Sequence, residues 1–199
     1  MIARALFLAF AFTLPAAPTL ASDAAGSFAV KDVGLARCEN FMEAVKTKDE
    51  GQLARYVGWL GGFLTATNQR VPETFDLAPW QNTRTLTAYL ATHCGKNPDL
   101  RFGGAVIQLS TALHEDRLRE KSDLVPIEHE GQTHYYVYRE ALRRAQAVLA
   151  DRGMYSGNMD GEFNEETRTA LKAFQGEKAL NETGLPDQET LFRLLQKDG

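Results

Sequence analysis

The sequence predicts a mainly α-helical protein with two small domains and a short β-hairpin between them. Three observations support this fold class. Apolar residues recur at helical spacing along most of the chain, only two cysteines are present, and one short motif occurs twice in the last sixty residues. The predicted parts are a signal peptide (1–21), a leader (22–34), a helical domain (35–120), a linker with the hairpin (121–138) and a second domain (139–196).

Residues 1–21 are typical of a secretory signal peptide. Arg4 is the only charged residue in this stretch, an apolar run follows it, and Thr19 and Ala21 occupy the small-residue positions before a cut after Ala21. The apolar run is shorter than the roughly 20 residues that span a membrane. We therefore expect cleavage and export to the periplasm, with an uncleaved anchor as the alternative, and no membrane association beyond this segment.

The charge and cysteine content fit an exported protein. The net charge is −4, and loss of the positive Arg4 makes it −5, so no basic face is expected for a nucleic-acid partner. Cys38 and Cys94 are the only cysteines, and in an oxidising compartment they should form one disulfide. Closing a loop of this length stabilises the fold by roughly 4 kcal/mol. Two free buried thiols are the alternative.

Four helices are predicted in the first domain. Apolar residues at helical spacing place them at about 38–45, 53–64, 83–94 and 98–113. Asn97 is the predicted N-cap of the fourth helix, and Pro98 its first residue. Gly58, Gly61 and Gly62 lie on one side of the second helix. Because glycine weakens a helix, these three predict that another backbone packs closely against that side.

The linker contains two β-prone runs, Val125–Ile127 and Tyr135–Tyr138, on either side of "EHEGQT". They predict a hairpin that leads into a helix. An isolated hairpin is barely stable, so this one should pack on a neighbouring domain or be mobile.

The second domain contains an internal repeat with spacings of three, three and four residues. Its two copies are Gly161, Asn164, Thr167, Leu171 and Gly184, Asp187, Thr190, Leu194. Each copy predicts a glycine turn, an Asx N-cap and an apolar anchor one turn into a helix. The threonine hydroxyls can reach back toward the caps. With an earlier helix at Leu142–Leu149, the result is three short helices around one core.

These motifs resemble the common three-helix peptidoglycan-binding domain. The family pattern is matched by "Asp-Gly-x-Phe-x-x-x-Thr", by "Phe-Gln" and by "Thr-Gly-x-x-Asp-x-x-Thr" between residues 160 and 190, and by Gln146, Tyr155 and Gly157 before them. The resemblance implies peptidoglycan as a partner and a shallow groove beside the aromatic-glycine turn and the start of the middle helix. A glycan or stem peptide needs an apolar face and convergent polar groups, so the candidate binding residues are Tyr155, Asn158, Asp160, Phe163 and Arg168.

The first domain more weakly resembles small periplasmic helical proteins, which include acid-stress chaperones and secretion-system immunity proteins. The matching residues are Cys38, Trp59, Gly62, Cys94, Asn97 and Pro98. Because such proteins differ in activity, this resemblance implies a fold and a disulfide more than a function. A protein partner for this domain is the corresponding expectation.

No motif for catalysis, metal binding or cofactor binding stands out. His93, His129 and His134 are expected to be exposed histidines, no Gly-x-Ser-x-Gly motif occurs, and no phosphate-binding loop occurs. We therefore expect no catalytic residues, no metal and no cofactor. The alternatives are a cell-wall hydrolase with its catalytic part in residues 35–120, and a periplasmic chaperone or scaffold without a peptidoglycan ligand.

Overall fold

The computed structural model describes residues 22, 23 and 25–196, so the predicted signal peptide lies outside the described residues. The described residues from Lys31 onward belong to one compact unit, and those before it to another. No helix in the described part of the chain is both long and apolar enough to cross a membrane.

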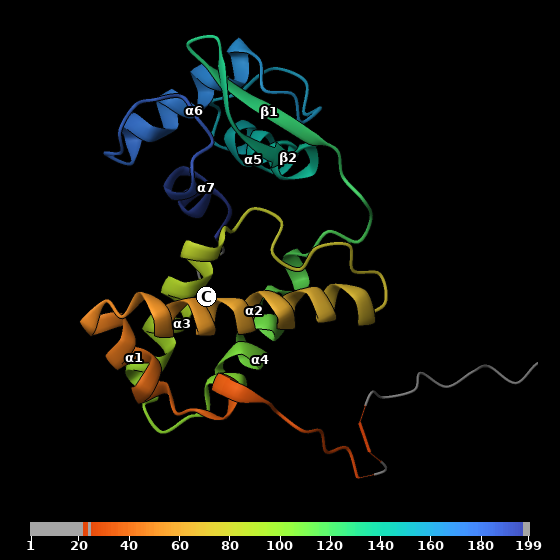
Figure 1. Cartoon of the computed structure of the whole chain (residues 1–199). Coiled ribbons are helices and arrows are strands. Elements are labelled where there is room, and N and C mark those ends of the chain that lie inside the picture. The colour runs from red at the N-terminus through yellow and green to blue at the C-terminus, as the bar shows by residue number, and fades with distance from the viewer. Residues whose placement is uncertain (1–21, 24, 197–199) are drawn as a thin grey trace, which may run out of the picture. The chain divides into compact units, whose positions relative to one another are not determined.

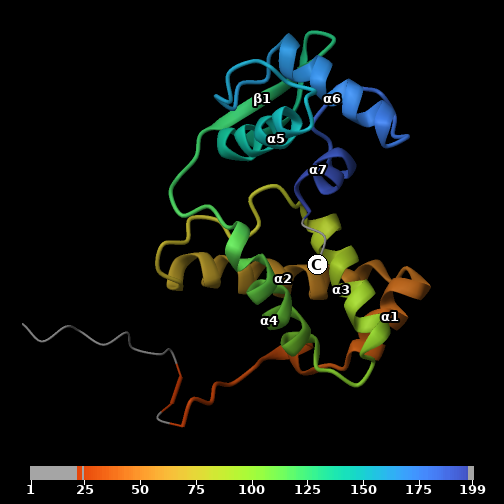
Figure 2. The same ribbon diagram turned by 180° about the vertical axis from the view of Figure 1, so that it is seen from behind.

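The first domain consists of four α-helices, as predicted. They follow a short 3-10 helix and are followed by a second one: η1 (Asp32–Leu35), α1 (Cys38–Thr47), α2 (Glu50–Arg70), α3 (Thr83–Lys96), α4 (Phe102–Leu113) and η2 (His114–Asp116). Figure 1 shows these helices together, and the view from behind in Figure 2 shows α3 and α4 crossing α2. The predicted leader ends inside η1, where Val33 is buried in the core of the domain.

Aromatic rings and one disulfide form the centre of this domain. Phe41, Tyr56 and Phe102 come from α1, α2 and α4, and their ring centroids lie 4.7 to 5.1 Å apart. The predicted disulfide joins Cys38 to Cys94, with a Cα–Cα distance of 4.9 Å. It therefore connects the start of α1 to the last turn of α3, beside the aromatic cluster.

The predicted start of the fourth helix is wrong. Asn97 ends α3 instead of beginning α4: its backbone N–H donates to the Cys94 carbonyl and its side-chain Nδ2 donates to the His93 carbonyl. α4 begins only at Phe102. Two backbone carbonyls in the segment between α3 and α4, those of Pro98 and Leu100, accept hydrogen bonds from the first backbone N–H groups of α1. The turn thus satisfies donors that α1 could not satisfy within itself.

The predicted close packing at the glycines of α2 is also wrong. Gly58, Gly61 and Gly62 are all exposed, and a Cβ built on any of them would meet no atom within 4 Å. The apolar side of α2 is the opposite one, where Tyr56 and Leu60 are buried. Within the described part of the chain, these glycines therefore face open space.

The predicted hairpin is present. Strands β1 (Leu124–His129) and β2 (Gln132–Tyr138) are antiparallel. Their two-residue turn, Glu130 and Gly131, has φ of 52° and 76°, the positive values that a tight hairpin turn of right-handed twist requires. Alternate side chains (Val125, Ile127 and Val137) are buried in the core of the second domain. The hairpin therefore packs on this neighbour.

The second domain contains the three predicted helices, α5 (Arg139–Asp151), α6 (Glu165–Glu177) and α7 (Gln188–Leu195), which lie with the hairpin in Figure 1. Both predicted N-caps are confirmed. The Asn164 carboxamide oxygen accepts from the Thr167 N–H at 2.9 Å, and the Asp187 carboxylate accepts from the Thr190 N–H at 2.8 Å.

One core residue of the second domain comes from the first. Trp80 lies in the segment between α2 and α3, yet it is only 6% exposed and packs in the cluster formed by the hairpin and α5–α7. The Gln188 side chain holds this segment: Nε2 donates to the Trp80 carbonyl at 2.6 Å, and Oε1 accepts from the Asn82 N–H at 2.7 Å. Helical spacing along the chain gives no sign of this contact.

Candidate functional site

The second domain is organised by two buried glutamines, each of which binds the turn that follows its helix. Gln146, on α5, is fully buried. Its Oε1 accepts from the Gly161 N–H at 2.8 Å, and its Nε2 donates to the Glu162 carbonyl and the Thr167 hydroxyl, both at 3.0 Å. One side chain therefore satisfies a donor and two acceptors that burial would otherwise leave unpaired.

Gln175, on α6, repeats this arrangement one helix later. Its Oε1 accepts from the Gly184 N–H at 2.7 Å, and its Nε2 donates to the Leu185 carbonyl at 3.0 Å and the Thr190 hydroxyl at 2.9 Å. We call these two arrangements the glutamine clasps. Gln175 therefore pairs buried backbone groups as Gln146 does, and the threonines of the repeat, Thr167 and Thr190, each accept from one of the two clasps.

The prediction that the threonine hydroxyls reach back to the N-cap residues is confirmed for one of the two copies of the repeat. Thr167 Oγ1 lies 3.0 Å from the Asn164 carboxamide oxygen, so it does reach back to its cap. For Thr190 only the backbone N–H bonds to the Asp187 cap, while the hydroxyl serves as an acceptor for Gln175.

Glycine is required in both clasps by geometry. Gly161 has a φ of 74°, and a Cβ there would lie 2.2 Å from the Arg139 carbonyl oxygen. Gly184 has a φ of 68°, and its Cβ would lie 3.0 Å from the Arg168 carbonyl oxygen. Both the positive φ and the close approach of another backbone exclude a side chain. The two turns therefore dock on the starts of α5 and α6.

Three of the five predicted binding residues lie around the first clasp. Tyr155 is buried, and its hydroxyl donates to the Asn158 carbonyl at 2.7 Å. The Asp160 carboxylate accepts from the Glu162 N–H at 2.9 Å and lies 3.4 Å from Gln146 Nε2. The Glu162 backbone N–H, followed by the Gln146 amide, holds the pKa of Asp160 below its usual range. Tyr155 and Asp160 therefore hold the turn in place.

The other two predicted residues form a separate pair. The Arg168 guanidinium lies over the Phe163 ring, 4.7 Å from its centroid. The same guanidinium donates to the Glu128 carbonyl of the hairpin at 2.6 Å. Among the described residues, no hydrogen bond, ion pair or ring contact joins this pair directly to Tyr155, Asn158 or Asp160. Arg168 therefore fixes the hairpin against α6.

Two of the predicted binding residues, Asp160 and Arg168, line separate surface hollows. Arg168 and Lys172 of α6 line one of about 560 Å³ with the hairpin turn. Asp160 lines another of about 550 Å³, which we call the arginine hollow. Asp160 and Arg168 therefore line different hollows.

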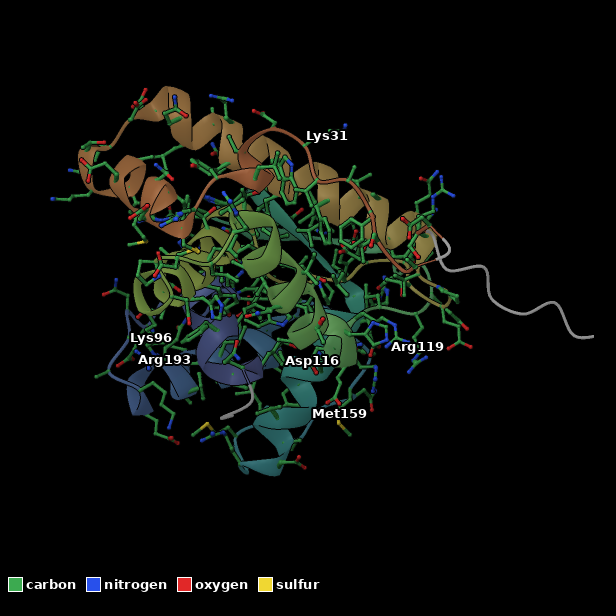
Figure 3. The ribbon with its side chains drawn as sticks, turned by 90° about the horizontal axis from the view of Figure 1, so that it is seen from below. Lys31, Lys96, Asp116, Arg119, Met159 and Arg193 are labelled. Atoms are coloured by element: carbon green, nitrogen blue, oxygen red, sulfur yellow. A yellow bond between two sulfur atoms is a disulfide. The ribbon has the colours of Figure 1, made fainter. Side chains whose placement is uncertain are left out.

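The arginine hollow is rich in both charges. Its basic lining side chains are Arg117, Arg119, Lys121, Arg139, Arg143 and Arg144, and its acidic ones are Glu115, Glu120, Asp123, Glu140 and Asp160. Nitrogen atoms of several side chains lie close to Arg119 in Figure 3, where Asp116 and Met159 are also labelled. Most of these charges are paired: Glu140, for example, binds Arg143 at 2.6 Å and Arg144 at 3.1 Å.

Comparison with known proteins identifies the second domain. Residues 138–194 match the family model described as "Putative peptidoglycan binding domain". This segment is a domain of that family. The resemblance found in the sequence is thus confirmed for the peptidoglycan-binding domain. No curated protein and no solved structure gives a significant match to the chain, so the weaker resemblance of the first domain stays a prediction.

Three carboxyl groups in the described part of the chain, Glu140, Asp160 and Glu177, have a shifted pKa, and all three shifts are downward. The Arg143 side chain is the largest cause at Glu140, and the Lys178 side chain at Glu177. No group of three or more His, Cys, Asp or Glu side chains within the described ranges is placed to hold a metal ion.

The clasp formed by Gln146 was not predicted. Gln146 belongs to the family pattern, but the pattern by itself gives no contacts for its side chain. A signal was available, because Gln146 lies among Leu142, Ala145 and Leu149 on the apolar face of its helix. A glutamine on such a face must find partners for its amide inside the domain.

Proposed function

We propose that this is an exported, non-catalytic protein that docks on peptidoglycan through its C-terminal domain and presents its helical domain to a protein partner. The match of residues 138–194 to the peptidoglycan-binding family carries the proposal. The intact glutamine clasps support it further, since both turns of the family pattern are held in place by Gln146 and Gln175.

Two features support export and the absence of catalysis. The Cys38–Cys94 disulfide fits an oxidising compartment such as a bacterial periplasm. A glycoside hydrolase needs a general acid whose pKa is raised, whereas the shifted carboxyl groups of the described residues all have a lowered pKa. These groups stay ionised near neutral pH and do not supply that acid.

The exposed side of α2 supports the proposed protein partner. Gly58, Gly61 and Gly62 leave this side without side chains, although each glycine costs about 1 kcal/mol relative to alanine in a helix interior. No packing contact among the described residues requires them. A partner whose backbone approaches α2 closely would explain why glycine occupies these three positions.

Sedimentation with insoluble peptidoglycan sacculi tests wall binding. The purified chain beginning at Ser22 should sediment with sacculi, and it should stay in solution when the sacculi have first been digested to soluble muropeptides. Absence of sedimentation would contradict the peptidoglycan ligand and favour a protein scaffold. Release of soluble muropeptides by the chain itself would contradict the non-catalytic role and favour the hydrolase.

Export has its own test. In cells that express the full chain, the periplasmic fraction should contain a form that begins at Ser22, as measured by mass spectrometry of the intact protein. Cys38 and Cys94 in this form should resist alkylation until a reductant is added. A cytoplasmic chain with two free thiols would contradict export.

A further inference from the structure

A groove lies between strand β2 and the segment that carries Trp80. We call it the hairpin groove. Its volume is about 270 Å³, and its lining includes Tyr136, Tyr138, Leu124, Gln81, Asp76 and Gln188. It differs from the site implied by the family pattern, because none of the five residues predicted from that pattern lines it.

One wall of the hairpin groove is aromatic and apolar. Tyr136 is 60% exposed and Leu124 is 56% exposed. Tyr136 pairs with Pro126 in the hairpin register and Leu124 pairs with Tyr138, so these side chains share the outer face of the hairpin. The face of an aromatic ring is electron-rich and attracts polarised C–H groups. An exposed tyrosine face beside a groove therefore offers a stacking surface for the C–H face of a sugar ring.

The opposite wall offers a hydrogen-bond donor that is not in use. Gln81 is only 8% exposed. Its Oε1 accepts from the Trp80 N–H at 3.4 Å, whereas its Nε2 has no hydrogen-bond partner among the described residues. The buried side-chain atoms without a partner in the described residues are His93 Nε2 and Tyr135 Oη, so Gln81 Nε2 is accessible to solvent. A ligand carbonyl in the groove can therefore accept from it.

The charge of the groove favours an uncharged ligand. No lysine, arginine or histidine lines it, in contrast to the arginine hollow. The Asp76 carboxylate is already engaged, because it accepts from the Ala78 N–H at 3.0 Å. Burial, followed by the Asp76 charge, raises the pKa of Tyr138. The Tyr138 phenol therefore stays neutral, and no cation is available to pair with an anionic ligand.

We infer that the hairpin groove binds one N-acetylated sugar unit of the peptidoglycan glycan strand. The sugar ring stacks on Tyr136, and its acetamide carbonyl accepts from Gln81 Nε2. The volume lies just below the range of about 300 to 1,000 Å³ that is usual for ligand pockets, which suits one sugar ring and not a longer stretch. This inference rests on the proposed function, since it names the part of the wall polymer that is recognised.

Binding of the chain beginning at Ser22 to peptide-free glycan strands tests this inference. The strands are prepared from sacculi by an amidase that removes the stem peptides, and chitotetraose serves as a soluble probe. Tyr136→Ala should weaken binding about tenfold, the equivalent of about 1.4 kcal/mol. Gln81→Leu should weaken it by a similar factor. Leu35→Ala is the matched control, because Leu35 is an exposed apolar side chain outside the groove, 54% exposed.

The outcomes separate this inference from the proposed function. Loss of glycan binding in Tyr136→Ala but not in Leu35→Ala would support the hairpin groove. If the unmodified chain binds sacculi and Tyr136→Ala binds the glycan equally well, the groove is not the site. Binding to sacculi but not to peptide-free strands would also overturn the inference, because the ligand is then the stem peptide. Failure to bind sacculi at all would overturn the proposed function itself.

Discussion

Each of the two domains is stabilised internally by a different kind of interaction. The helical domain joins distant segments by one covalent bond, Cys38–Cys94, beside a cluster of aromatic rings. The C-terminal domain has no cysteine and depends on side-chain hydrogen bonds within short loops, through Gln146 and Gln175. We therefore expect reduction to destabilise the first domain most, and single polar substitutions to destabilise the second.

The difference follows from what each domain must satisfy. The turns before α6 and α7 bury backbone N–H and carbonyl groups at Gly161, Glu162, Gly184 and Leu185, and unpaired groups of this kind cost about 1 to 3 kcal/mol each. The glutamine clasps pair them. In the helical domain these groups are mostly paired within long helices, so its stability depends more on the closure of a long loop.

Reduction of the disulfide should have the largest effect. Cys38 and Cys94 are 56 positions apart, so Cys38→Ala with Cys94→Ala should lower the free energy of unfolding by about 4 kcal/mol. Hydrogen exchange followed by mass spectrometry should show faster exchange in α1 and α3 than in α6. Equal acceleration in both domains would show that the two do not unfold separately.

Removal of one clasp should come next. Gln146→Ala leaves the Gly161 N–H, the Glu162 carbonyl and the Thr167 hydroxyl without their partner and should cost about 3 kcal/mol. Chemical denaturation measures this change in the free energy of unfolding, and hydrogen exchange monitors the amides of the loop. Arg143→Ala, on the exposed side of the same helix, is the control and should cost less than about 1 kcal/mol. Similar losses for the two variants would contradict the importance of the clasp.

A smaller effect is expected at the helix cap. Asn164→Ala removes the acceptor of the Thr167 N–H and should lower stability by about 1 kcal/mol. Asn164→Asp keeps a cap and should preserve most of this stability. Thermal unfolding of the three proteins tests the expectation, which is contradicted if alanine and aspartate behave alike.

The smallest expected effect is a gain. Gly61→Ala on the open side of α2 should raise stability by up to about 1 kcal/mol, since alanine favours the helix and meets no atom within 4 Å. Gly184→Ala is the matched contrast and should destabilise, because it combines a positive φ with a close carbonyl. If Gly61→Ala destabilises, this side of α2 is covered in solution.

Much of the fold could be predicted because its signals are local. The caps at Asn164 and Asp187 act on backbone groups three positions away, and the hairpin turn is set by two adjacent residues. The start of α4 was mispredicted because Asn97 can cap either end of a helix. The distant backbone donors of α1, which use the Pro98 and Leu100 carbonyls, decide between the two.

The five candidate binding residues stay a prediction, and the structure gives several of them a role in the fold. Two of the residues taken from the family pattern, Tyr155 and Asp160, hold a turn through their hydrogen bonds. The Arg168 guanidinium is chemically suited to bind a ligand, but it donates to the Glu128 carbonyl of the hairpin. The hairpin groove was not predicted, because its two walls lie more than forty positions apart in the sequence.

The sequence by itself determined the helices of both domains, the repeated glycine turns, the disulfide and the family of the second domain. Each of these depends on residues a few positions apart or on residue types that occur rarely. Only the tertiary structure decided that Trp80 enters the second domain, where Gln188, 108 positions away, donates to its carbonyl. It also decided that the glycine side of α2 faces open space. Such contacts depend on how whole helices pack, and spacing along a single segment does not record that packing.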